Sequence, residues 1–282
     1  MTGHIQTIEP SATKEPVRTA TSPLRHSADA VLSVRHATSF MLLTMGAGAV
    51  NAGAFIACER FVAHVTGNVT RIGLDASAWV LMLEYVAVLV AFVVGAMLSV
   101  AAIQARAFRG ERPRPGIPLL MVVATLCVAA LAGYWGVFGP VGGHAEKPTD
   151  FALLYVLAGA MGLMNASVAS STAYAVRITH MTGPATDLAV HLATAWYARG
   201  EERKLALRLA GLRGGKILAF VVGAALMVPL MHTIGYLAFM MPALFVLVGT
   251  LRSFVSFPLS IFGKTTHQPM QSMDLVQKGS QS

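Results

Sequence analysis

Long charge-free apolar runs alternate with short polar segments along most of the chain. A helix rises 1.5 Å per residue, so about 20 apolar residues are needed to cross roughly 30 Å of hydrocarbon. Four runs reach that length alone, and these are 37–58, 85–105, 117–141 and 151–176. A fifth run, 217–251, is too long for one crossing and contains Pro229 and Pro242. We expect it to form two short helices that turn near His232 and Thr233, which gives six predicted spans.

Two polar segments flank the apolar runs. Residues 1–35 are rich in Thr, Ser, Pro and charge and have no apolar face, so we expect a disordered tail. We do not expect this segment to be a signal peptide, because the first apolar run begins only after Arg35. Residues 256–282 are expected to form a second disordered tail.

A polar motif occurs twice between the apolar runs. Residues 64–70 read HVTGNVT, and residues 180–186 read HMTGPAT. Each copy follows a Gly-x-x-Asn-Ala element and precedes an AFVVGA element, in the same order in both halves. The chain is therefore an internal duplication, with three predicted spans in 36–141 and three in 151–255. An odd number of spans per copy predicts that the copies enter the membrane from opposite sides, as inverted repeats.

The composition indicates whether the chain folds in water or in a lipid bilayer. Apolar residues make up 55% and charged residues only 12%, which is typical of an integral membrane protein. The net charge of +8 does not predict nucleic-acid binding, because the basic residues lie between apolar runs. If both termini are cytoplasmic, only three of the 21 Lys and Arg residues fall outside, namely Arg60, Arg71 and Lys147. This bias predicts a membrane protein with both ends in the cytoplasm.

The sequence contains no enzyme motif that we can identify, and we expect neither catalysis nor a cofactor. The two cysteines, Cys58 and Cys127, are far apart and give no disulfide or metal pattern. Near 199–213 the second half has about a dozen extra residues, in which Leu205, Leu209 and Leu212 share a helical face opposite basic residues. This pattern predicts an interfacial helix on the anionic cytoplasmic leaflet of the lipid bilayer. Three spans per half also make a homodimer a reasonable hypothesis.

The two TG motifs have two interpretations. Irregular backbone within hydrocarbon is tolerated only when it is buried in protein or lines a watery cavity, and such breaks bind solutes in inverted-repeat transporters. Alternatively, the motifs are helix caps and turns at the ends of spans one and four. Under the first interpretation the solute-binding candidates are Asn51, Thr66, Gly67, Asn68, Asn165, Thr182 and Gly183.

Other polar residues near the motifs also have alternative roles. Asn51 and Asn165 either hold two helices together or contact a solute. His64, His180 and Glu84 either take part in proton coupling or are interfacial side chains. Arg71 and Asp187 follow the two motifs at equivalent positions with opposite charge. They either pair across the repeat interface as a gate or stay at opposite surfaces.

The motifs resemble those of a known family. A GxxNA element followed by VTGN in the first half, and GLxNA followed by HMTGxxTDL in the second, are similar to the YoaK family of uncharacterised bacterial inner-membrane proteins. The resemblance covers roughly residues 36–255. It implies a multi-pass membrane protein and supplies no substrate or catalytic residue.

The sequence thus predicts an all-α integral membrane protein of six helices, built as two inverted three-helix repeats. The expected function is a small-solute permease or channel whose site lies between the TG segments. The alternative is a non-transporting membrane scaffold or sensor in which these segments only pack the halves together. A polar cavity between Asn51, Thr66, Asn165 and Thr182 would favour the permease, and an apolar filling there would favour the scaffold.

Overall fold

The computed structural model describes residues 34–111, 114–142, 148–172 and 176–253. Apart from the first residues of α2, the two predicted tails lie outside these ranges. All regular secondary structure in the described ranges is helical. Its elements are α2 (Val34–Cys58), α3 (Val65–Leu74), α4 (Trp79–Phe108), α5 (Gly116–Tyr134), α6 (Pro148–Ser171), α7 (Thr182–Tyr197), α8 (Gly200–Ile234), the short 3₁₀ helix η1 (Gly235–Phe239) and α9 (Met240–Ser253).

Among the described residues, five helical stretches are long and apolar enough to cross a membrane. They are His36–Cys58, Trp79–Arg106, Gly116–Tyr134, Phe151–Ser171 and Gly200–Ser253. The described part of the chain is therefore all-helical and has the long apolar helices of a membrane protein. The fifth stretch combines α8, η1 and α9, and α9 alone has 14 residues, which span about 21 Å. The six-helix count depends on how this stretch is divided and stays a prediction.

The turn inside the fifth stretch lies later than predicted. Helix α8 continues through His232 and Thr233 to Ile234, and the chain turns at Gly235, whose φ is 58°. Pro229 lies inside α8 without ending it, and the Thr233 hydroxyl donates a hydrogen bond to the Pro229 carbonyl. The helix ends where a glycine adopts a positive φ that other residues avoid, so the glycine and not the proline sets the boundary.

Two other helices end earlier than their apolar runs. Helix α5 ends at Tyr134 instead of continuing to 141, and Gly136 just beyond it has a φ of 81°. Helix α6 ends at Ser171 instead of 176. There the Thr172 hydroxyl oxygen accepts a hydrogen bond from the Val176 amide, which closes a local turn. Both boundaries depend on backbone geometry that an apolar run does not encode.

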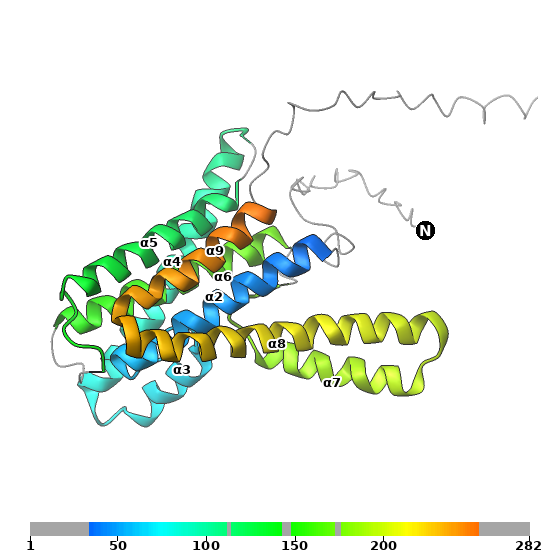
Figure 1. Ribbon diagram of the computed structural model, residues 1–282, viewed down its shortest axis with the longest axis horizontal. Coiled ribbons are helices and arrows are strands. Elements are labelled where there is room, and N and C mark those ends of the chain that lie inside the picture. The colour runs from blue at the N-terminus through cyan, green and yellow to red at the C-terminus, as the bar shows by residue number, and fades with distance from the viewer. Residues whose placement is uncertain (1–33, 112–113, 143–147, 173–175, 254–282) are drawn as a thin grey trace, which may run out of the picture.

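The helices of the two halves pack against each other in equivalent pairs (Figure 1). Helix α2 packs on α8 in one pair, and α4 packs on α6 in the other. Helix α2 also contacts α9, and the equivalent contact joins α6 and α5. Fully buried Leu43, Leu157, Met161, Met164 and Met227 contribute to the common core. Most of the helix packing therefore lies between the halves.

Glycines allow these helices to approach to backbone contact. A methyl group on Gly48 of α2 would overlap the Phe220 carbonyl of α8, and one on Gly162 of α6 would overlap the Phe92 carbonyl of α4. A methyl group on Gly95 would likewise overlap the Gly159 carbonyl, and one on Gly223 would overlap the Met45 carbonyl. Gly48 and Gly162 thus lie on small-residue faces where helices of the two halves meet.

Two helices lie at the periphery of this arrangement. Helix α3 packs on α4, and α7 packs on α8. In Figure 1 α7 and the first half of α8 form a hairpin that extends beyond the rest of the bundle. Residues 199–213, predicted to form an interfacial helix, lead into and form the first part of α8, which runs without interruption into its apolar half.

Candidate functional site at two irregular segments

The TG motifs lie at the start of separate helices. Helix α2 ends at Cys58, and irregular residues 59–64, the first break, lead to α3. Helix α6 ends at Ser171, and α7 follows irregular residues 176–181, the second break. Thr66 and Gly67 are thus in the first turn of α3, and Thr182 and Gly183 in the first turn of α7. The interpretation of these motifs as end caps of spans one and four is therefore wrong in its location.

Equivalent asparagines hold the two breaks. The Asn51 Oδ1 atom accepts a hydrogen bond of 3.1 Å from the Ala63 amide. The Asn165 Oδ1 atom accepts one of 3.3 Å from the Thr179 amide. Each side chain ties a helix to the irregular segment that follows it, and so satisfies a backbone donor that has no helical partner. The structure gives these asparagines a local bonding role, and it brings each of them to its own break.

One carbonyl at an equivalent position in each break, that of Phe61 or Arg177, accepts its hydrogen bond from a different donor in each half. The Asn68 amide nitrogen donates to the Phe61 carbonyl at 3.0 Å. Pro184 stands at the position equivalent to Asn68 and has no such donor. Instead the Lys216 ammonium, from α8, donates to the equivalent Arg177 carbonyl and to the His180 carbonyl, the latter at 2.9 Å.

Lys216 is the main residue that the sequence did not identify as part of the site. It is only 7% exposed, and its position at the end of a basic segment suggested a loop charge that sets topology. One signal was available, because Pro184 removes the donor that Asn68 supplies in the first half. The identity of the replacement donor depends on the packing of α8 on the second break.

The two histidines lie over the motif glycines. The His180 Nε2 atom accepts a hydrogen bond of 3.1 Å from the Gly183 amide. The His64 ring lies so close to Gly67 that an added Cβ would be 2.6 Å from its Nδ1 atom. His64 also makes an edge contact with Phe61, with 5.8 Å between ring centroids. Glycine at these positions leaves room for the histidine rings.

The predicted charged residues have separate partners. Arg71 pairs with Asp75 at 3.9 Å, and Asp187 pairs with Arg213 at 3.2 Å. The structure does not bring Arg71 and Asp187 together. Glu84 pairs with Arg60 of the first break at 3.6 Å. The Arg60 guanidinium also lies 5.3 Å from the centre of the Tyr85 ring, so this arginine bridges the first break and α4.

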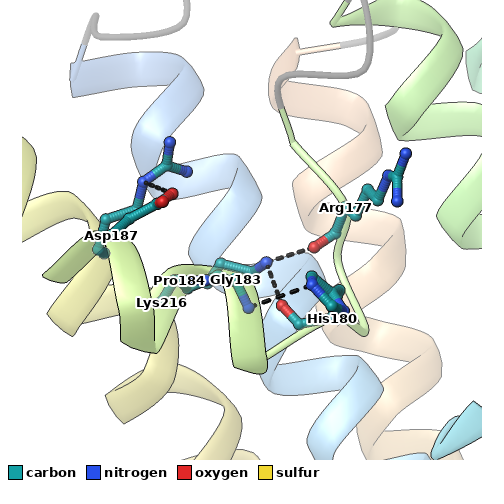
Figure 2. Close-up of a pocket in the computed structure, with 7 residues that line it drawn as sticks. Arg177, His180, Gly183, Pro184, Asp187 and Lys216 are labelled. Atoms are coloured by element: carbon teal, nitrogen blue, oxygen red, sulfur yellow. Dashed lines mark hydrogen bonds and ion pairs between the residues drawn. The ribbon is translucent and has the colours of Figure 1, made fainter. Parts of the chain in front are cut away.

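A polar cavity of about 170 Å³ adjoins the second break (Figure 2). Its lining residues are Arg177, His180, Gly183, Pro184, Asp187, Arg213 and Lys216. Figure 2 shows the carbonyl of Arg177 directed at Lys216 while its guanidinium points away. Of the predicted site residues, the cavity includes His180, Gly183 and Asp187. Lys216 and the Asp187–Arg213 pair give it charges of both signs, which suit a small polar molecule.

No metal site was found in the part of the chain that the structure describes. No group of three or more His, Cys, Asp or Glu side chains there is placed to hold a metal ion.

Comparison with known proteins gives one match. The profile of a family described as a protein of unknown function, DUF1275, matches residues 39–251. The chain belongs to the DUF1275 family. The matched range includes both breaks and Lys216, and it agrees with the resemblance drawn from the repeated motifs. No curated protein and no solved structure matches the chain.

Proposed function

We propose that this protein is a small-solute permease of the bacterial inner membrane, built from two inverted halves whose breaks act as gates. The observation that carries the proposal is the relation between the breaks. Both are tied to the preceding helix by an asparagine, but their contacts to later helices differ. Inverted-repeat transporters bind solutes at such irregular segments and expose them by movement of one half against the other.

The difference between the breaks is consistent with a structure open on one side. At the first break, Arg60 reaches Glu84 and lies over Tyr85 on α4. At the second break, a cavity of about 170 Å³ lies beside Lys216. With both termini in the cytoplasm, the second break faces the cytoplasm. In this proposal the solute enters there, and the Lys216 contacts with the second break must rearrange for passage.

The scaffold alternative also has an observation in its favour. Met161 and Met164 on α6, on either side of Gly162, are fully buried, as is Leu43 on α2. Apolar side chains of this kind fill the contact between the halves and close a path through it in this state. A permease therefore requires a second conformation, whereas a scaffold does not. The test must detect solute binding and movement directly.

The test begins with thermal unfolding of the purified protein across a panel of small polar metabolites. A ligand at 100 times its Kd stabilises the folded state by about 2.7 kcal/mol. At about 2–4 °C per kcal/mol, this raises Tm by roughly 5–10 °C. A stabilising metabolite is then followed by its uptake into proteoliposomes. Lys216→Met should abolish both effects, and Lys204→Met, which removes an exposed lysine paired with Glu201, should retain them.

Two results would contradict the permease. The first is a panel without any stabilising metabolite together with no uptake of panel members, which is the outcome that a scaffold predicts. The second is a reporter fused after residue 30 or after residue 260 that reports the periplasm, because the inverted arrangement requires both ends in the cytoplasm.

A further inference from the structure

The α7–α8 hairpin has small residues inside and large apolar residues outside. Ala195 of α7 and Ala206 and Ala210 of α8 are each about 5% exposed or less. In contrast, Trp196 and Tyr197 are each 85% exposed. An isolated hairpin in water normally buries its largest apolar side chains. The reversed distribution indicates that the outer face of α7 is covered by something else.

The outer face of α7 has the pattern of a helix-packing seam. Ala189, Leu192, Ala193 and Trp196 follow one another at spacings of three, one and three residues, which places them on one side of a helix. All four are exposed, with Leu192 at 50%. We name these four residues the α7 stripe. Its small alanines beside a leucine and a tryptophan allow another helix to approach closely.

Lipid chains do not cover the α7 stripe. Helix α7 packs on the first part of α8, whose exposed residues include Glu201, Glu202, Arg203 and Lys204. A charged side chain at the bilayer centre costs about 2.5–3.5 kcal/mol on insertion scales. This part of α8 therefore lies outside the hydrocarbon, and α7 lies outside with it.

A bilayer surface also fits the α7 stripe poorly. Helix α8 is one helix of 35 residues, about 52 Å long, which exceeds the roughly 30 Å of hydrocarbon. Its residues 200–216 precede the apolar half and extend about 25 Å from it. The headgroup layer adds only about 5–7 Å on each side. A stripe along a helix that leaves the membrane would touch a flat surface at one end only.

We propose that the α7 stripe binds the α7 stripe of a second copy of this chain. A two-fold axis along the membrane normal would set both hairpins upright and place the two stripes side by side, as an isologous contact requires. The hairpin tip has Glu201 and Glu202 next to Arg203 and Lys204, of which Lys204 pairs with Glu201 in the same chain, so the tip presents both signs of charge to a second copy. An anionic lipid surface would attract only the basic residues of this tip.

The exposed aromatic side chains of the hairpin supply a substantial part of the area that such a contact needs. An aromatic side chain buries about 150–250 Å². Trp196 and Tyr197, at 85% exposure, thus offer about 300–400 Å² in each copy. A stable interface buries about 800 Å² per partner, and Leu192, Val190 and the alanines supply further apolar area.

Cysteine cross-linking in native membranes tests the contact. Ala193→Cys, in a Cys58→Ala/Cys127→Ala background that keeps the parent Tm, should form a disulfide-linked dimer when oxidised. The matched control is Gly211→Cys on the outer side of α8, where a side chain would meet open space. The control should remain at least ten-fold less cross-linked. Equal cross-linking of both variants, or none of Ala193→Cys, would overturn the proposal.

Two further measurements separate the possible occupants. Light scattering in nanodiscs should show a dimer for the parent and a monomer for Ala193→Arg with an unchanged Tm, and a monomeric parent would contradict the proposal. With Trp79→Phe and Trp135→Phe, Trp196 is the single tryptophan. Its fluorescence should be insensitive to brominated phosphatidylglycerol, and strong quenching would assign the stripe to the anionic bilayer surface instead.

Discussion

The first and second breaks share their contact with the helix before them and differ in the later helix that supplies their next hydrogen-bond donor. Asn51 and Asn165 accept equivalent backbone hydrogen bonds. Beyond that point, Asn68 supplies a neutral donor in the first half, and Lys216 supplies a charged one in the second. The asparagine contact, which both halves share, gives a backbone amide of each break the hydrogen-bond acceptor that it would otherwise lack.

The charges that surround the breaks differ as well. Arg60 and Glu84 pair across the first break. Their equivalents in the second half are Val176 and Leu212, which line a small apolar cavity with Phe40. The first half thus has an ion pair where the second has two apolar side chains, and a neutral amide donor where the second has an ammonium. The two halves therefore keep the same asparagine–backbone hydrogen bonds, while each half has its own side-chain contacts around its break.

The largest effect is expected from filling the helix contacts that both halves share. Gly48→Val and Gly162→Val place a side chain against a carbonyl of a neighbouring helix, where only backbone movement can make room. Overpacking costs about 1–3 kcal/mol and occasionally more. We expect at least a several-fold loss of monodisperse protein in size-exclusion chromatography. Gly73→Val, which meets open space on α3, is the control. If all three variants behave alike, close approach is not what requires these glycines.

The second effect concerns the charged contact of the second break. Lys216→Met leaves the Arg177 and His180 carbonyls without this donor. A buried polar group left without its partner costs about 1–3 kcal/mol. We expect a lower Tm and faster proteolysis at the second break than for Asn68→Leu, which removes one bond at the first break. Equal losses would mean that the ammonium contributes no more than the amide.

The third effect should be the same in both halves. Asn51→Leu and Asn165→Leu each leave one backbone amide without its acceptor. We expect each variant to lose about 1–3 kcal/mol, as estimated from Tm in the same detergent. Because the two bonds are equivalent, the losses should agree within about 1 kcal/mol. A strongly unequal pair would show that the shared contact is not equally important in the two breaks.

A smaller effect is expected at the motif glycines. In Gly67→Val and Gly183→Val the new side chain meets a histidine ring that can rotate away, so the loss should be below that of Gly162→Val. Removal of the ring provides the internal check. Gly183→Val combined with His180→Ala should recover part of the Tm lost by Gly183→Val alone. Failure to recover would indicate that the backbone, and not the ring, requires glycine.

The smallest effect is expected for the interaction free energy between Arg71 and Asp187, measured by a double-mutant cycle. Each has its own partner, Asp75 and Arg213 respectively. Arg71→Asp, Asp187→Arg and the combined swap should therefore give additive changes in unfolding free energy, within about 0.5 kcal/mol. A swap that restores what the single variants lose would place the two charges in contact in another conformation.

The sequence predicted the helical membrane class and most helix positions because apolar length reports directly on hydrocarbon thickness. It did not predict the turn at Gly235 or the end of α6 at Ser171, because those depend on single backbone conformations and a threonine hydrogen bond. The repeated motifs correctly drew attention to the breaks. They did not reveal Lys216, since its role arises from the contact of α8 with a segment about 35–40 residues earlier.

The exchange of packing partners between the halves also affects synthesis of the protein. Helix α4 packs on α6, and α2 packs on α8, so α2, the first of these helices to leave the ribosome, finds its main partner only late in translation. About 100 residues separate the end of α5 from the end of α8, which takes about 5–20 s at 5–20 residues per second. The glycine face of α4 contacts only lipid or other membrane proteins until α6 emerges, and that of α2 until α8 emerges. A chain that stops after α5 would keep those faces open and would be a substrate for membrane proteases.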